Sequence, residues 1–309
     1  MEIIRSVLPV ITMLLIGMLI HKKNIISEEG IKGLQALVMN VTLPLGLFGT
    51  FYKTSLTADQ FILPLTMFIL VSGGIFFSRL LGKAFRQTDP YMPFMASGYE
   101  FGMLGYALIA ILAGSENITS FAIMDLGHSL AIFTVYIAML KGIGGEKQTA
   151  GQVVKGLLST PVLVAILAGT LIGVTGLGRL LVKCGAGSII DSVCSFASAP
   201  TSAAILVVIG YRMNFRGLDV KRVAGVCAVR IVMQLVFVIA VLTVFRLIGG
   251  ACAEELTTMS FILALILPPP FILPLYIENT EQKEFYSLSI SAFTLLSVIA
   301  FIVMVAVYA

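Results

Sequence analysis

Glu100 is the residue of this sequence with the clearest potential for chemistry. It stands between two glycines in Gly98-Tyr99-Glu100-Phe101-Gly102, inside a long apolar stretch. A carboxylate at bilayer depth is unfavourable unless it is paired or hydrated, and such residues usually serve a function. Glu100 is therefore predicted to bind substrate or a coupling ion. The alternative is a protonated acid that bonds backbone atoms freed by the glycines.

Asp125 and His128 form a second candidate pair. Their i, i+3 spacing puts both side chains on one face of a helix. They could relay protons, because histidine titrates near neutral pH, or form a neutral structural hydrogen bond; both interpretations stay open. Together with Glu100 they are the predicted ion-coupling residues, for a proton or a sodium ion. No cofactor or metal is expected, because the four cysteines form no CxxC pair and the histidines have no metal-finger spacing.

A run of prolines, Pro268-Pro269-Pro270 followed by Pro274, marks a second unusual segment. A proline inside a helix removes a hydrogen bond and costs about 3 kcal/mol. Three in a row predict a broken helix, with a simple kink as the alternative. Non-helical backbone is not tolerated in lipid, so the segment must be buried in protein or line a cavity.

The elements that position these residues follow from composition. The chain has 309 residues, of which 58% are hydrophobic and 12% charged, with a mean hydropathy of +1.03. An ordinary soluble chain has about 25% charged residues, so this one is predicted to be an integral membrane protein. Its apolar stretches, each compared with the ~20 residues that a membrane helix needs, are 3–20, 31–52, 60–82, 91–113, 119–140, 157–177, 188–211, 223–249, 257–277 and 285–308. The longest connection, 141–156, is too short for a soluble catalytic or nucleic-acid-binding domain.

The basic residues predict how the chain is oriented. If successive loops alternate sides, 15 of the 20 lysines and arginines fall on one side, which is then cytoplasmic. Both termini of this multi-pass cell-membrane protein are then outside, with position 147 in the cytoplasm and position 116 outside. Arg230 is expected to snorkel to the cytoplasmic surface, which leaves the centre of every span without a basic residue.

Two parts of the chain resemble each other. Pro9–Ile20 and Pro161–Ile172 are identical at six of twelve positions with a constant offset of 152. Pro44 and Pro200 are a weaker matching pair. Five spans per copy is an odd number, so the second copy enters the membrane from the opposite side. The chain is therefore predicted to consist of two inverted five-helix repeats, 1–143 and 152–309, an arrangement typical of alternating-access transporters.

Several of these motifs resemble the auxin efflux carrier family, in particular its bacterial branch. They are Asn40-Val-Thr-Leu-Pro44, Gly102-Met-Leu-Gly105, Ser198-Ala-Pro200 through Gly210, and Pro268–Pro274 with Tyr276. The resemblance implies an all-α membrane protein with ten helices, a scaffold from spans 1, 2, 6 and 7, and spans 4 and 9 that unwind and cross. It also implies transport of small organic anions and a homodimer through the scaffold. Many members have Asn at the span 4 crossing and Pro shortly after, where this chain has Glu100 and Ala107.

The leading hypothesis is a secondary transporter of small organic anions, and the alternative is a cation/proton antiporter or sodium-coupled carrier that uses Glu100. The third class is a non-transporting membrane sensor or an intramembrane enzyme. An enzyme has only Asp125 and His128 in its favour, so no enzyme is predicted. The expected partners are the organic anion and the lipid bilayer, and no nucleic acid. The predicted substrate-binding residues are Asn40, Thr42, Pro44, Tyr99, Glu100, Gly102, Pro200, Thr201, Pro268, Pro269 and Pro270.

Overall fold

The computed structural model describes residues 2–54, 58–84, 89–145, 148–213, 217 and 219–308, and this part of the chain is helical with no strand. The α-helices are α1 Glu2–Lys23, α2 Glu28–Leu37, α3 Leu43–Phe51, α4 Ile62–Ala84, α5 Met92–Ala96, α6 Tyr106–Ala113, α7 Thr119–Ala131, α8 Ile137–Ile143, α9 Ala150–Leu158, α10 Pro161–Val174, α11 Leu177–Lys183, α12 Ala186–Ser198, α13 Thr201–Arg212, α14 Val220–Ile248, α15 Glu255–Ile266 and α16 Thr280–Tyr308. Wide π-helical turns occur at Val38–Thr42, Phe101–Gly105 and Ile132–Tyr136, and 3₁₀ turns at Ala58–Phe61, Gly250–Ala253 and Leu273–Tyr276.

Seven helical segments in the described residues are long and apolar enough to cross a membrane. The number becomes eight if α9 and α10, which meet at an angle of 76°, are counted as one span. The all-α membrane fold is therefore confirmed, and the full set of ten spans remains a prediction. The seven segments are Glu28–Phe51, Ile62–Lys83, Met92–Ala113, Thr119–Ile143, Ala186–Arg212, Val220–Ile248 and Thr280–Tyr308.

The connection 141–156 differs from its prediction as a loop. Its second half begins helix α9, because Thr149 accepts a hydrogen bond from the backbone of Gln152 and the Gln152 side chain bonds back to Thr149. This reciprocal cap stabilises a helix start even in a polar stretch. Position 147 lies outside the described residues.

Two helix pairs pack through glycines at equivalent places. Gly17 of α1 lies against the backbone of Val207 in α13, and Gly169 of α10 lies against Phe51 in α3. Gly17 and Gly169 are 152 positions apart, the offset of the sequence match, while Phe51 and Val207 are 156 apart, the offset of Pro44 and Pro200. The contact between α1 and α13 thus has a counterpart between α10 and α3.

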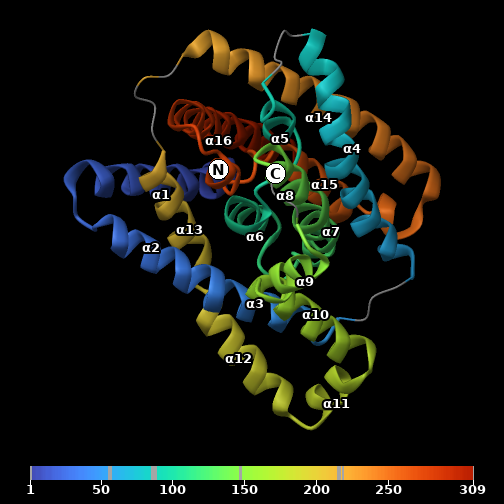
Figure 1. The fold of residues 1–309 in the computed structure, drawn as a ribbon. Coiled ribbons are helices and arrows are strands. Elements are labelled where there is room, and N and C mark those ends of the chain that lie inside the picture. The colour runs from blue at the N-terminus through green and yellow to red at the C-terminus, as the bar shows by residue number, and fades with distance from the viewer. Residues whose placement is uncertain are drawn as a thin grey trace.

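The remaining helices surround the interrupted ones. Figure 1 shows α1 and α13 at the left, α4 at the right, α14 across the top and α12 at the bottom, with α5, α6 and α15 between them. α4 lies along α7 at a close approach where Gly127 contacts the carbonyl of Pro64, which leaves no room for a side chain. This arrangement buries α5 and α6 most completely.

Candidate functional site

Two helices are interrupted at the centre of the molecule, and the interruptions contact each other. The first runs from Ser97 to Glu100, between α5 and the π-helical turn that leads into α6; the second runs from Leu267 to Ile272, after α15. The backbone N–H of Glu100 donates to the carbonyl of Pro268 at 2.9 Å. We call these two segments together the paired break. The buried prolines Pro268 to Pro270 prevent a helix through the second one.

Gly98 gives the first segment its path. Its φ of +75° lies in the left-handed region, which other residues rarely adopt. A Cβ there would also come within 2.9 Å of Pro270 and 3.1 Å of the Tyr136 ring. Gly98 therefore lets the two segments approach each other closely.

Glu100 bridges the two segments that follow the breaks. Its Oε1 accepts a hydrogen bond from the backbone N–H of Met103 at 3.2 Å, and its Oε2 accepts one from the N–H of Phe271 at 2.7 Å. Unpaired N–H groups at a helix start carry partial positive charge and attract anions. The carboxylate of the chain itself thus takes two backbone donors, one in the π-helical turn that leads into α6 and one just before the 3₁₀ turn Leu273–Tyr276.

Arg230 binds the carbonyl groups at the carboxyl ends of the two helices that precede the breaks. Its side chain is 0% exposed, and its two terminal nitrogens donate to four carbonyls at 2.8–3.0 Å. Those carbonyls end α5 and α15, where the helix dipole is negative. They belong to Met95, Ala96, Gly98 and Leu267.

The prediction that Arg230 snorkels to the cytoplasmic surface is wrong, as is the prediction that the span centres contain no basic residue. The side chain of Arg230 contacts the end of α5, Leu267 after α15 and Phe293 of α16, inside the protein. The guanidinium lies 5.0 Å from the ring centre of Tyr99 and 4.9 Å from that of Phe293. Four carbonyl acceptors and two aromatic faces replace the water that the charge loses.

Asp125 and His128 contact each other as their spacing predicts, with 3.2 Å between Oδ1 and Nδ1. The backbone N–H of Tyr99 donates to His128 Nε2 at 3.2 Å. A backbone N–H can only donate, so we assign the imidazole proton to Nδ1, facing Asp125. Asp125 also accepts from the Tyr106 hydroxyl at 2.9 Å and from Ser129 at 3.1 Å. Through these hydrogen bonds the pair holds the backbone of Tyr99 beside Glu100.

The other predicted substrate-binding residues divide into buried or partly buried ones and exposed ones. Thr42 and Thr201 are buried and joined by a hydrogen bond of 2.8 Å between their hydroxyls. Gly102 lies next to Glu100 and Pro44 is buried in α3, whereas Asn40 and Pro200 are exposed.

Sequence reasoning missed the roles of three residues that contact the paired break or the π-helical turn Phe101–Gly105 after it. Arg230 is the first. Gln35 donates to the sulfur of Met103 at 3.6 Å, and a Cβ on Gly102 would come within 3.1 Å of Met39. Gln35 was recognisable as a polar residue in an apolar stretch, but Met39 carried no signal.

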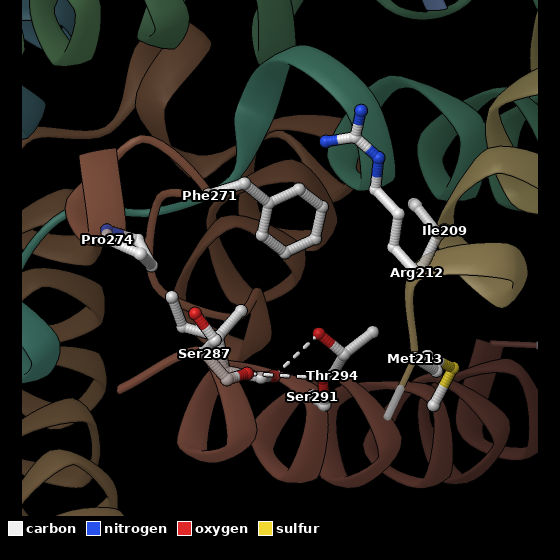
Figure 2. Close-up of a pocket in the computed structure, with 9 residues that line it drawn as sticks. Ile209, Arg212, Met213, Phe271, Pro274, Ser287, Ser291 and Thr294 are labelled. Carbon is white, nitrogen blue, oxygen red and sulfur yellow. Dashed lines mark hydrogen bonds between the residues drawn. The ribbon is translucent and has the colours of Figure 1, made fainter. Parts of the chain in front are cut away.

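A pocket of about 190 Å³ opens beside the second half of the paired break. Figure 2 shows Phe271 and Pro274 on one side, Arg212 and Met213 at the end of α13 on another, and hydroxyl-bearing residues of α16 facing them. The lining residues are Ile209, Arg212, Met213, Phe271, Pro274, Ser287, Ile290, Ser291 and Thr294. Phe271 thus contributes its N–H to Glu100 and its side chain to this pocket.

A smaller hollow of about 70 Å³ lies between α3, α6 and the start of α13. Its lining includes Thr201, Ser198 and Tyr106, and the Tyr106 hydroxyl is bonded to Asp125. Among the described residues, no group of three or more histidine, cysteine, aspartate or glutamate side chains could hold a metal ion.

Comparison with known proteins agrees with this architecture. The family model described as "Membrane transport protein" matches residues 2–309, and the chain belongs to this family, the auxin efflux carrier family that the motifs resemble. The chain is also 24% identical over 218 residues to an uncharacterized transporter of Methanothermobacter thermautotrophicus (strain Delta H), covering 69% of this chain and 68% of the relative. The protein is thus a multi-pass membrane transport protein and not an enzyme.

Proposed function

We propose that this protein is a secondary active transporter of small organic anions, and that the anion binds at the paired break. One observation carries the proposal: the N–H groups of Met103 and Phe271 converge on a carboxylate. The Met103 donor lies in the π-helical turn that leads into α6, and the Phe271 donor precedes the 3₁₀ turn Leu273–Tyr276. Backbone N–H groups that point at one position can bind an anion without a buried lysine or arginine. A substrate carboxylate can take the same two hydrogen bonds.

We further propose that the transporter has ten spans in two inverted repeats and moves by an elevator-like mechanism. The matching contacts of Gly17 with Val207 and of Gly169 with Phe51 support two related halves. α1, α3, α10, α12 and α13 pack on one another and form the proposed scaffold. The paired break belongs to the proposed mobile domain, whose helices 4 and 9 cross at the break.

The two cavities support access paths between the proposed scaffold and the proposed mobile domain. The pocket at Arg212 lies between α13 and the segment at Phe271, and the smaller hollow lies between α3, α13 and α6. Each is therefore lined by the proposed scaffold on one wall and by the proposed mobile domain on another. Arg212 gives the first pocket a positive group that attracts anions.

The cation/proton antiporter or sodium-coupled carrier is the second candidate, favoured by Glu100 as a partly exposed carboxylate at the break. Cations bind to the carbonyl ends of broken helices in such transporters. In this protein Arg230 already takes four of those carbonyls. This weighs against a cation site and in favour of the anion.

Removal of a single backbone donor tests the anion site. Phe271→Pro deletes the N–H, and position 271 tolerates proline because it is the second residue of a turn closed by Leu273 N and Pro270 O at 3.1 Å. This variant and its control are both made in a Glu100→Ala background, so that no internal carboxylate competes for the donor. A lost hydrogen bond to a charged group is worth about 1.5–3 kcal/mol, so the affinity for the anion should then fall roughly ten- to a hundredfold. Phe271→Ala is the matched control, since it removes the same ring and keeps the donor.

The measurement is saturable uptake and binding of radiolabelled small carboxylates by purified protein in proteoliposomes. We expect Phe271→Ala to bind more tightly than Phe271→Pro. Equal affinities in the two variants would contradict the anion site. Saturable sodium binding without carboxylate binding would favour the second candidate.

The proposed orientation predicts the sides of two loops. In a variant without native cysteines, a cysteine at position 147 should react with a membrane-impermeant reagent only after the cells are opened. A cysteine at position 116, just after α6, should react in intact cells. Labelling of both positions from the same side would overturn the proposed span order.

A further inference from the structure

We infer that Glu100 is an internal substitute for the carboxylate of the substrate, which allows the empty transporter to reorient, so that the protein performs net transport and not obligatory exchange. The inference rests on the proposed function. It concerns what the paired break contains when no substrate is bound.

The geometry of Glu100 joins both halves of the paired break. Its carboxylate bonds the N–H groups of Met103 and Phe271, two residues 168 positions apart in the chain (271 minus 103). Its own backbone N–H bonds the carbonyl of Pro268 at 2.9 Å. The backbone of Glu100 is therefore bonded to the second segment of the paired break, and its side chain is bonded to the N–H groups of Met103 and Phe271.

The carbonyl ends are satisfied as well, by Arg230. Its four hydrogen bonds are independent of any ligand. The empty site thus contains one internal anion, Glu100, on two backbone N–H groups and one internal cation, Arg230, on four backbone carbonyls. Neither set of backbone groups has to cross the low-dielectric middle of the membrane unpaired.

A transporter without Glu100 would face a different situation. The N–H groups of Met103 and Phe271 would have no hydrogen-bond partner in the empty state, and unpaired N–H groups inside the membrane are strongly unfavourable. Only the anion-loaded form would then move readily, which is the condition for obligatory exchange. Glu100 removes that condition.

Substrate loading requires the carboxylate of Glu100 to leave its two donors. Glu100 is partly exposed, whereas its neighbours Tyr99 and Phe101 are buried. The side chain can therefore turn toward water while the substrate carboxylate takes the donors of Met103 and Phe271. The substrate carboxylate and the Glu100 carboxylate therefore compete for the same two N–H groups and cannot bind them at the same time.

The test compares net efflux with exchange in proteoliposomes loaded with a transported carboxylate. In the wild-type protein, efflux into substrate-free buffer and efflux into buffer with substrate should differ by less than about twofold, because the N–H groups of Met103 and Phe271 have a carboxylate partner in both the empty and the loaded form. In Glu100→Gln, exchange should persist while net efflux falls at least roughly tenfold, because the amide accepts one N–H bond and presents a donor to the other N–H.

Glu28→Gln is the control, since Glu28 is an exposed acid at the start of α2 that pairs with Lys32 at 3.0 Å. It should leave both rates unchanged. Loss of both rates in a monodisperse Glu100→Gln protein, or retention of both, would overturn the inference. If that variant does not fold, a tenfold stimulation of wild-type efflux by external substrate overturns it. Absence of any carboxylate transport by wild type contradicts the proposed function instead.

Discussion

Arg230→Met is expected to lower the unfolding temperature of the purified protein by several degrees and to abolish transport. The substitution leaves four buried carbonyls without their donor, at Met95, Ala96, Gly98 and Leu267. Each unsatisfied buried group costs about 1–3 kcal/mol, and removal of one partner from a buried charged cluster costs about 3–5 kcal/mol in total. The paired break would lose the contact that joins α14 to both interrupted helices.

Arg246→Met is the matched control, because Arg246 lies on the same helix and is exposed. Thermal unfolding in detergent, followed by fluorescence together with size-exclusion chromatography, gives the comparison. The unfolding temperature of Arg230→Lys should lie between those of Arg230→Met and Arg246→Met, since an ammonium has three donors and lacks the planar geometry of a guanidinium. A wild-type melting temperature for Arg230→Met would mean that Arg230 does not stabilise the paired break.

Gly127→Ala is expected to have the second largest effect, a marked loss of folded protein. A Cβ at this position would overlap the carbonyl group of Pro64, where α7 and α4 approach most closely. Overpacking typically costs about 1–3 kcal/mol, and the upper end applies because a backbone carbonyl cannot turn aside as a side chain does. The two helices would have to move apart along their shared length.

Gly73→Ala provides the comparison for this prediction. Gly73 is on α4, it is exposed, and a Cβ there meets no atom within 4 Å. It should keep the yield and the unfolding temperature of the wild type, while Gly127→Ala loses several degrees in the same assay. Equal behaviour of the two variants would show that α4 and α7 tolerate a wider separation.

The sequence predicted the local features of the site well. Three consecutive prolines break a helix wherever they occur, and a carboxylate between glycines in an apolar stretch is conspicuous without any knowledge of its partners. The partners of Arg230 were not predictable in this way. Its acceptors are backbone carbonyls 37 to 135 positions away, and they become acceptors only because two other helices end there.

Asn40 illustrates a second limit. Asn40 and Pro44, four residues apart, were both predicted to bind substrate, yet Asn40 is exposed and Pro44 is buried. The π-helical turn Val38–Thr42 explains the difference, because its i to i+5 hydrogen bonds place more residues in each turn than an α-helix does. The faces on either side of the turn are shifted, so Met39, and not Asn40, lies against Gly102.

The placement of the partners of Arg230 along the chain also gives the protein an order of biogenesis. Met95, Ala96 and Gly98 leave the ribosome before α14, whereas Leu267 follows it. A lone arginine at the centre of a nascent span costs about 2.5–3.5 kcal/mol on insertion, and three acceptors are already present to reduce that cost. Arg230 then binds the carbonyl of Leu267, which is synthesised last. The hydrogen bonds at the centre of the protein therefore form in the order in which the chain is synthesised.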